Sequence, residues 1–255
     1  MTFADQFSGH ADAYSQFRPS YPAELFRALA ERAPGRDRAW DCATGSGQAA
    51  VGLAAEFGRV IATDGALRQV TTAAAHPRVT YVAALAERCP ILGGSVAAVT
   101  IAQALHWVDR PAFFREVERV LVPGGVLAVW CYTLPTVAPG VDAVLRRFYD
   151  LTVGPYWLEG RALVDEGYRS VEIPFDRFEI SGLAIERELA LDEFAGYVGT
   201  WSAVQRCRRL TGADPMPLFV AEVAAAWGAP AGRRLVRWPL HVRGGVKRSR
   251  VRRRR

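Results

Sequence analysis

The chain has 255 residues, which suffice for one large domain or for a core domain with an insertion. Half of the residues are hydrophobic and 23% are charged, a composition that is ordinary for a globular enzyme. No apolar run approaches the ~20 residues of a membrane span, and the N-terminal residues lack the pattern of a secretory signal. We therefore expect no membrane contact and a cytoplasmic location.

The formal net charge of +6 is concentrated at one end of the chain. Seven of the 32 basic residues lie within residues 247–255, and the remaining 25 nearly balance the 26 acidic residues. We predict that residues 244–255 form a basic, disordered tail, which would bind nucleic acid only non-specifically. The body of the protein is close to neutral.

Cysteine and histidine spacing gives no support for a metal site. The four cysteines form no C-x-x-C pair, and the four histidines are equally scattered along the chain. We expect no bound metal, and we interpret the cysteines as reduced thiols that are mostly buried.

Residues 1–37 are predicted to form an N-terminal cap that contains a helix over 23–32. Residues 38–132 alternate strand and helix patterns at short intervals, which is typical of a parallel sheet with helices on its faces. The predicted strands are 38–42, 60–63, 79–83, 96–102 and 126–132, and the helices between them are 48–56, one that ends near 75, and 111–121. Asp109 is placed to cap the last of these helices.

Residues 133–243 change character, with prolines that interrupt short helices. Helices are predicted over 161–167, 191–197 and 215–227, and strands over 184–191 and 235–242. Pro239 places the last strand in a bent or edge position, because proline cannot donate a ladder hydrogen bond. The interpretation is a single domain, residues 1–243, whose sheet is completed late and whose inserted helices form a lid.

The first predicted strand ends at Asp41 and leads through Gly45-x-Gly47 into a helix. Glycines in such a turn let the backbone approach a ligand, and the helix start offers free N–H groups. Asp64 closes the next strand, where a carboxylate can accept hydrogen bonds from both hydroxyls of a ribose. These features indicate a nucleoside-like ligand.

Two cofactor classes fit such a turn. A dinucleotide site needs G-x-G-x-x-G, but Ala50 stands at the third glycine position. S-adenosylmethionine has no pyrophosphate and carries a cationic sulfonium, and an acid such as Asp41 directly before the loop suits it better. The pattern therefore favours methyl transfer, with a nicotinamide-dependent oxidoreductase as a distant alternative.

A set of motifs in order makes this interpretation more specific. They are Phe17-Arg18-Pro19-x-Tyr21-Pro22, Trp40 to Gln48, Ala86-Glu87, Ala102 to Trp107, Arg119-Val120-Leu121-x-Pro123-Gly124-Gly125, Gly196 to Ser202 and Arg237 to Leu240. Over about residues 3–243 the chain resembles the class I S-adenosylmethionine-dependent methyltransferases of the type 11, trans-aconitate methyltransferase-like group. The resemblance implies a doubly wound, Rossmann-like α/β fold with a seven-stranded sheet, its last strand antiparallel, and a helical lid.

The resemblance also implies a cofactor site. Tyr14 and Arg18 would bind the methionine carboxylate and close over the cofactor, while Gln103 would line the methionine side. Asp64 would hold the ribose, and Ala86 would meet the adenine with Glu87 nearby. The loop residues of the predicted site are Asp41, Ala43, Thr44, Gly45 and Gly47.

Three residues depart from the pattern of the group. Ala43 stands where glycine is commoner, Leu85 where an acid often contacts adenine, and Ala97 where an aspartate usually opens the fourth strand. These departures leave open a catalytically weak cofactor-binding module.

The candidate acceptor site is carried by aromatic residues and one histidine. His106 could act as a general base or could simply pack the end of the fourth strand, and the two interpretations have equal support. The predicted acceptor-lining residues are Trp107, Tyr132, Tyr197 and Trp201, with ordinary core packing as the alternative for each. Arg161 is interpreted as a solvated helix start, and pairing with an acceptor carboxylate is the alternative.

The predicted function is S-adenosylmethionine-dependent methylation of oxygen or nitrogen on a small-molecule acceptor, carboxylates included, with S-adenosylhomocysteine as product. A different class of acceptor is the alternative: an RNA or a protein, docked through the basic tail.

Overall fold

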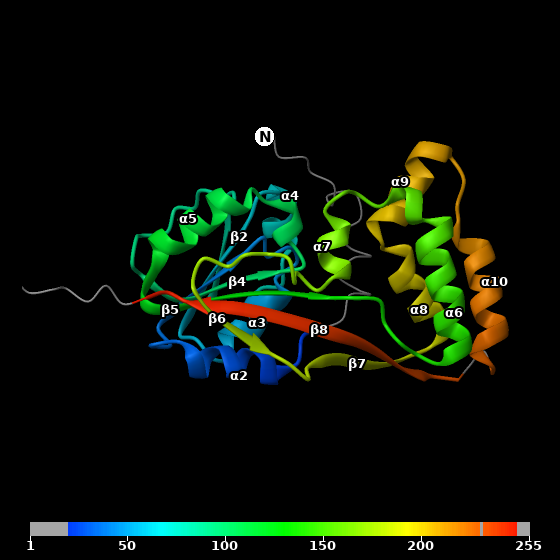
Figure 1. The fold of residues 1–255 in the computed structure, drawn as a ribbon, viewed down its shortest axis with the longest axis horizontal. Coiled ribbons are helices and arrows are strands. Elements are labelled where there is room, and N and C mark those ends of the chain that lie inside the picture. Colours follow the sequence, from blue (N-terminus) through cyan, green and yellow to red (C-terminus); the bar gives the residue numbers. More distant parts are fainter. Residues whose placement is uncertain (1–19, 230–231, 249–255) are drawn as a thin grey trace, which may run out of the picture.

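The computed structural model describes residues 20–229 and 232–248 (Figure 1). Its sheet has the strand order β3-β2-β1-β4-β5-β8-β6, and β7 pairs with β8 off this path. The strands are β1 Arg38–Cys42, β2 Arg59–Asp64, β3 Val79–Ala83, β4 Val96–Ala102, β5 Leu121–Tyr132, β6 Asp176–Ile180, β7 Ala184–Leu189 and β8 Arg234–Val246. β1 to β5 are parallel to one another, and β8 is antiparallel to β5, β6 and β7. The predicted doubly wound sheet with an antiparallel last strand is confirmed.

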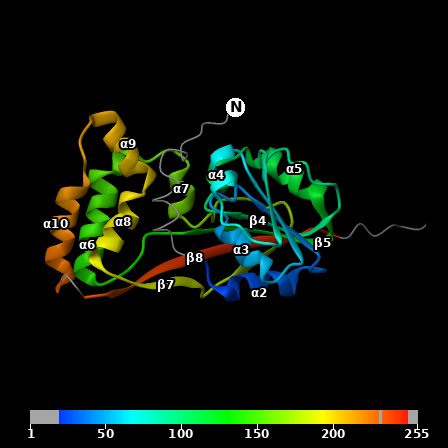
Figure 2. The ribbon, with the colours of Figure 1, turned by 180° about the vertical axis from the view of Figure 1, so that it is seen from behind.

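Helices cover both faces of the parallel part of the sheet (Figures 1 and 2). α2 (Ala23–Arg32) and α3 (Gln48–Ala54) pack on one face, and α5 (Arg110–Val120) packs on the other. Successive strand residues alternate between the two cores, because neighbouring side chains on a strand point to opposite faces. Ala128 lies in the core beneath α2 and α3, whereas Val129 lies in the core beneath α5. As predicted, Asp109 caps α5, since its carboxylate accepts the N–H of Ala112.

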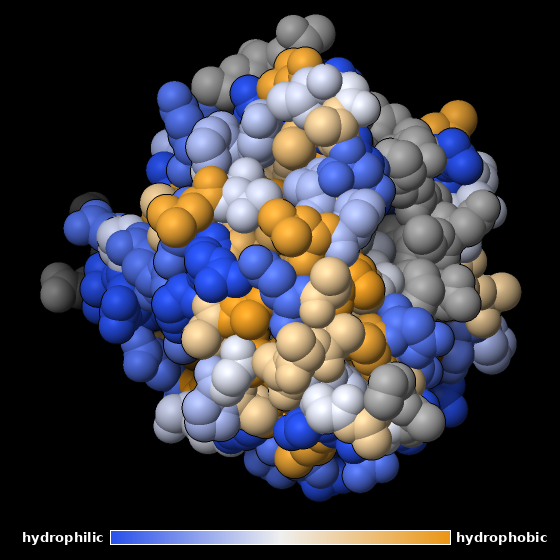
Figure 3. All heavy atoms as spheres, turned by 90° about the vertical axis from the view of Figure 1, so that its right-hand side faces the viewer, coloured by the Kyte–Doolittle hydropathy of each residue, from blue (hydrophilic) through white to orange (hydrophobic). Residues whose placement is uncertain are grey.

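A layer of helices extends the molecule beyond the sheet, on the right of Figure 1 and on the left of Figure 2. Its elements are α6 Pro139–Arg147, the π-helix Phe148–Thr152, the 3₁₀-helix Gly154–Tyr156, α8 Leu191–Gly199, α9 Ser202–Thr211 and α10 Met216–Trp227. Aromatic rings fill its interior, and Phe148 and Phe219 lie 4.4 Å apart between centroids. Its outer face mixes apolar and polar side chains (Figure 3). Leu218 of α10 is an exposed apolar side chain. The short α7 (Arg161–Asp165) lies between this layer and the sheet (Figure 1).

The last strand differs from its prediction in two respects. Only its first half has an edge position: Arg234–Pro239 pairs with β7 and has one isolated bridge on its other side, whereas the second half lies between β5 and β6. Pro239 sits where β8 changes partners, so its missing N–H costs no ladder bond in the central part of the sheet. β8 also continues to Val246, which corrects the predicted start of the tail at residue 244. Residues 249–255 lie outside the described residues.

The structure places all four cysteines as buried, unpaired thiols, as interpreted. Burial raises the pKa of Cys131 to about 12, which keeps this thiol protonated and unreactive. Within residues 20–229 and 232–248, no helix is both long and apolar enough to cross a membrane. The same ranges hold no cluster of three or more side chains arranged to bind a metal.

Candidate active site

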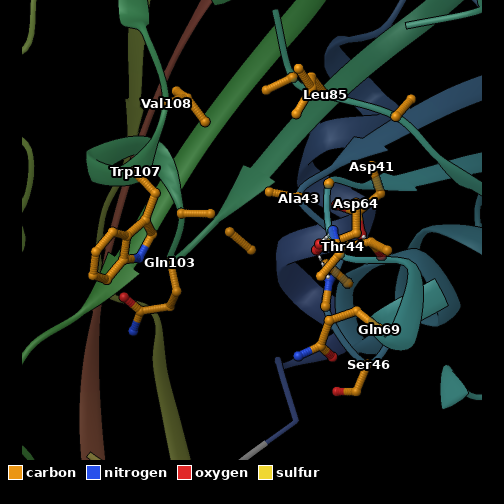
Figure 4. A pocket seen from close by; sticks show the side chains of 18 of the residues that line it. Asp41, Ala43, Thr44, Ser46, Asp64, Gln69, Leu85, Gln103, Trp107 and Val108 are labelled. Carbon is orange, nitrogen blue, oxygen red and sulfur yellow. Dashed lines mark hydrogen bonds between the residues drawn. The ribbon is translucent and has the colours of Figure 1, made fainter. Parts of the chain in front are cut away.

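A cavity of about 510 Å³ lies at the carboxyl ends of β1, β2 and β4 (Figure 4), where open α/β sheets bind their ligands. Its size falls within the roughly 300–1,000 Å³ of small-molecule sites. All the predicted cofactor residues that the structure describes line it except Gly47, and they are Asp41, Ala43, Thr44, Gly45, Asp64, Ala86, Glu87 and Gln103. Gly47 is the residue directly before α3. Tyr14 and Arg18 lie outside the described residues.

Asp41 anchors the loop that follows β1 through hydrogen bonds of its buried carboxylate. Its carboxylate is fully buried and accepts hydrogen bonds from the hydroxyls of Thr44 at 2.5 Å and Thr100 at 2.7 Å. Burial raises the pKa of Asp41 to about 6, and the two hydroxyls oppose this rise only in part. Asp64 adds to the rise in this pKa because its negative charge is nearby. The loop therefore rests on a carboxylate whose charge is only weakly stabilised in the free protein.

Asp64 ties the loop to the end of β2. One carboxylate oxygen accepts the N–H of Gly45 at 2.9 Å, and the other accepts the N–H of Ala66 at 2.9 Å. These two bonds hold the carboxylate at the wall of the large cavity, and a carboxylate is an acceptor for the hydroxyl groups of a ligand.

Backbone strain is concentrated at this site. Among the described residues, the non-glycine residues with positive φ are Ala43 (φ 51°), Gln103 (φ 54°) and Tyr168 (φ 58°). Ala43 and Gln103 line the large cavity, and the Tyr168 hydroxyl lies 3.0 Å from Nδ1 of His106. Strained conformations of this kind tend to cluster where function requires a fixed geometry.

Ala43→Gly is expected to raise the free energy of unfolding by about 1 kcal/mol, because glycine adopts the left-handed conformation without a Cβ clash. Chemical denaturation followed by circular dichroism measures this change. Ala221→Gly, at an exposed position in the middle of α10, is the control and should have the opposite effect, lowering the free energy of unfolding by about 1 kcal/mol. A destabilised Ala43→Gly protein would contradict the assignment of strain to this position.

The large cavity is electronegative. Asp41, Asp64, Glu87 and Asp109 line it, and no lysine, arginine or histidine among the described residues does. Glu87 is held in place by the N–H of Asp109, which it accepts at 2.8 Å. Such a cavity favours a cationic ligand and disfavours the two negative charges of a pyrophosphate. This disfavours the nicotinamide alternative.

A smaller cavity of about 60 Å³ adjoins the first, since Gln103, Trp107 and Tyr132 line both. Its other lining residues include His106, Arg161, Trp157, Tyr197 and Trp201. The structure thus gathers every predicted acceptor-lining residue around one space. Tyr197 and Trp201 are also buried and pack edge-to-face at 6.0 Å between centroids, so they belong to the aromatic core as well. In Figure 4, Trp107 and Gln103 lie across the large cavity from Asp64 and Thr44.

His106 stands between the sheet and α7. Burial, with a smaller contribution from Arg161, lowers the pKa of His106 to about 3. The imidazole is therefore neutral at neutral pH. A general base with so low a pKa would take up a proton poorly, since the best bases titrate near the working pH.

Arg161 is not the solvated helix start that we predicted. Its side chain is only 23% exposed, and its guanidinium lies over the rings of Trp157 (4.5 Å) and Tyr149 (5.2 Å). The signal was present in the sequence, because Arg161 follows the aromatic pair Tyr156-Trp157 much as Arg18 stands among aromatic residues.

The three departures from the family pattern fall in different places. Leu85 is 44% exposed at the margin of the large cavity, whereas Ala97 is buried in the core beneath α2 and α3. Ser46 and Gln69 also line the cavity (Figure 4), and sequence reasoning missed both. The Oγ of Ser46 is buried without a hydrogen-bond partner among the described residues. No spacing rule distinguishes Gln69 from an ordinary residue of α4 (Leu67–Thr72).

Comparison with known proteins identifies the family. The profile of a family described as a methyltransferase domain matches residues 40–129. A Dictyostelium discoideum protein named as a methyltransferase is 30% identical over 219 residues, which cover 84% of this chain and 83% of the relative. A solved structure from Anaeromyxobacter dehalogenans, described as a type II methyltransferase, is 45% identical, with a TM-score of 0.85 over 91% of this chain and all of that one.

The chain therefore belongs to the class I S-adenosylmethionine-dependent methyltransferases, in the type 11 group. S-adenosylmethionine is the cofactor of this class, and the electronegative cavity fits a cationic sulfonium. A Haemonchus contortus phosphoethanolamine N-methyltransferase, solved with S-adenosylhomocysteine, shares the fold at 16% identity with a TM-score of 0.50 over 98% of this chain and 61% of that one.

Proposed function

We propose that this methyltransferase binds S-adenosylmethionine in the large cavity and methylates oxygen or nitrogen on a small molecule held in the adjoining small cavity. The observation that carries the proposal is the difference in lining between the two cavities, one acidic and the other aromatic. Four carboxylates line the large cavity, and aromatic rings enclose the small one. When bound, the cofactor supplies a methyl group on a sulfonium centre and leaves as S-adenosylhomocysteine.

The residues that would hold the cofactor follow from the geometry. Asp64 would accept the ribose hydroxyls, since its carboxylate lines the cavity and is held there by the N–H groups of Gly45 and Ala66. Ala86 and Glu87 would face the adenine, since both line the cavity and the family pattern assigns them to it. The loop from Asp41 to Gly47, with Gln103, would enclose the amino-acid part, and Tyr14 and Arg18 remain part of this proposal on the family pattern alone.

The chain's contribution to transfer would be positioning and exclusion of water. Tyr132 and Trp201 are buried, and Trp107 stands between the two cavities. Walls of this kind align an acceptor atom and keep water away from it. Alignment and desolvation can supply much of the rate enhancement of a displacement at carbon. We assign His106 to positioning because its pKa of about 3 makes it a weak base.

Titration calorimetry tests the cofactor assignment. S-adenosylhomocysteine is expected to bind with one site per chain and micromolar affinity, whereas NAD should show no heat because its pyrophosphate would meet the four carboxylates of the cavity. Absence of S-adenosylhomocysteine binding at millimolar concentration would overturn the proposal.

A further inference from the structure

The two adjoining cavities differ in charge. Among the residues that line the small cavity, Arg161 is the one charged side chain at neutral pH, and no carboxylate lines it. The large cavity has the reverse arrangement: carboxylates line it, and none of its described lining residues is basic. A ligand that spans the boundary would therefore meet negative walls on one side and a positive group on the other.

The guanidinium of Arg161 is held in place by hydrogen bonds of its Nε and by two aromatic rings that lie against it. Its Nε donates to the hydroxyl of Tyr149 at 2.6 Å and to the carboxylate of Asp165 at 3.0 Å, while Trp157 and Tyr149 stack on it. Within residues 20–229 and 232–248, its two terminal nitrogens make no hydrogen bond. Two parallel N–H donors therefore remain available on a guanidinium that is already oriented, the arrangement that matches a carboxylate.

Two neighbouring features support a built site. Tyr168 is fully buried and adopts φ 58°, a strained conformation for a tyrosine. Its hydroxyl lies 3.0 Å from Nδ1 of His106, which lines the small cavity. The His106 ring is neutral and so adds no charge that competes with Arg161.

We propose that Arg161 binds a carboxylate of the methyl acceptor, and that this carboxylate anchors the acceptor and is not itself methylated. The inference rests on the proposed function and narrows its substrate class to small carboxylic acids with a separate nucleophilic oxygen or nitrogen. An acceptor whose only charged group is an ammonium would meet a positive guanidinium and no carboxylate in the small cavity.

The chemistry of transfer explains why the bound carboxylate is an anchor. If its oxygen attacked the methyl carbon, an oxygen–carbon bond would form, the carbon–sulfur bond would break, and the carboxylate and sulfonium charges would cancel. The attraction of Arg161 would then be stronger before transfer than in the transition state, which slows the step. A carboxylate that keeps its charge keeps the same attraction throughout, so Arg161 can position the acceptor without opposing the reaction.

A matched series of ligands tests the anchor. Butanoate, butanamide and butylamine have nearly the same shape and differ in charge, and each is titrated into protein saturated with S-adenosylhomocysteine. Butanoate is expected to bind at least 10-fold more tightly than the other two. In Arg161→Met this preference should fall to less than 2-fold, and Arg161→Lys should be intermediate because lysine lacks the planar fork. Arg146→Met, an exposed residue of α6, is the control and should match the wild type.

The outcomes separate this inference from the proposed function. If S-adenosylhomocysteine binds both wild type and Arg161→Met but butanoate shows no preference, the carboxylate assignment is wrong while the cofactor assignment stands. The second measurement incubates butanoate with methyl-labelled S-adenosylmethionine. No labelled methyl butanoate is expected, and formation of that ester would overturn the anchor role. Equal unfolding midpoints of Arg161→Met and wild type exclude a general loss of structure.

Discussion

Asp64→Asn is expected to weaken the binding of S-adenosylhomocysteine by about 100-fold. A hydrogen bond to a charged acceptor contributes roughly 1.5–3 kcal/mol, and loss of two ribose contacts of about 1.5 kcal/mol each corresponds to two orders of magnitude in Kd. In the variant, the NH2 group of asparagine also replaces one of the two accepting oxygens. It then faces the backbone N–H of Gly45 or Ala66, and two donors cannot form a hydrogen bond with each other. Calorimetric titration with S-adenosylhomocysteine measures the change.

The matched control for Asp64→Asn is Asp37→Asn, which removes one negative charge from an exposed residue ahead of β1 and should leave Kd unchanged. Asp64→Asn should lower the unfolding free energy by only about 1 kcal/mol, since it loses one loop hydrogen bond. A variant that still binds within 5-fold of the wild type would show that the ribose is held elsewhere in the cavity.

Local patterns were sufficient for most of the parallel half of the sheet and its helices. The helix 23–32 and the strands 38–42, 79–83 and 96–102 were predicted with the bounds that the structure has. β1 and β4 are buried along almost their whole length. The nearly continuous apolar run of β4 is typical of a parallel strand that is covered on both faces. Fold and cofactor loop were therefore both accessible from sequence.

The second half of the chain was predicted less well for identifiable reasons. β6 has exposed and half-buried residues only, so Asp176–Ile180 shows no apolar alternation that would mark a strand. α9 was missed because Ser202–Thr211 is largely polar and charged, although it buries Ala203, Val204 and Cys207 against its neighbours. Tertiary contacts decide both elements, and no local pattern carries that information.

The enclosure of Arg161 was not predicted, for a different reason, although pairing with an acceptor carboxylate was the alternative interpretation of this residue. A basic residue at a predicted helix start is solvated in most proteins. The aromatic pair Tyr156-Trp157 just before it was a hint, but the fold is needed to show that Trp157 and Tyr149 enclose the guanidinium. The adjacency of Arg161 to His106 and Tyr197 likewise arises from three separate segments of the chain. Sequence located the large cavity well because the segments that follow β1, β2, β3 and β4 line it, and each strand end was predicted. The small cavity depends on long-range packing.

Asp41→Asn is expected to stabilise the free protein at neutral pH, by up to about 3 kcal/mol. The pKa of Asp41 is about 6 in the folded protein and 3.8 ordinarily, and each unit corresponds to about 1.4 kcal/mol. Because the folded pKa is raised, the stability linked to this proton is fully present below pH 4 and is lost as the pH rises through 6. Wild type and Asp41→Asn should thus match at pH 4 and diverge by pH 7, as measured by denaturant unfolding.

Cofactor binding should respond to Asp41 in the opposite sense. A cationic ligand in the cavity favours the ionised carboxylate, so the Kd of the wild type for S-adenosylmethionine should rise as the pH falls below 6, by up to 10-fold per unit. Asp41→Asn should bind about 10-fold or more weakly at pH 7 and lose this pH dependence. A variant that is less stable at both pH 4 and pH 7 would show that the hydroxyls of Thr44 and Thr100 outweigh the cost of burial. The expected pair of results, greater stability with weaker binding, would mean that the loop keeps a destabilising buried charge because the cofactor needs it.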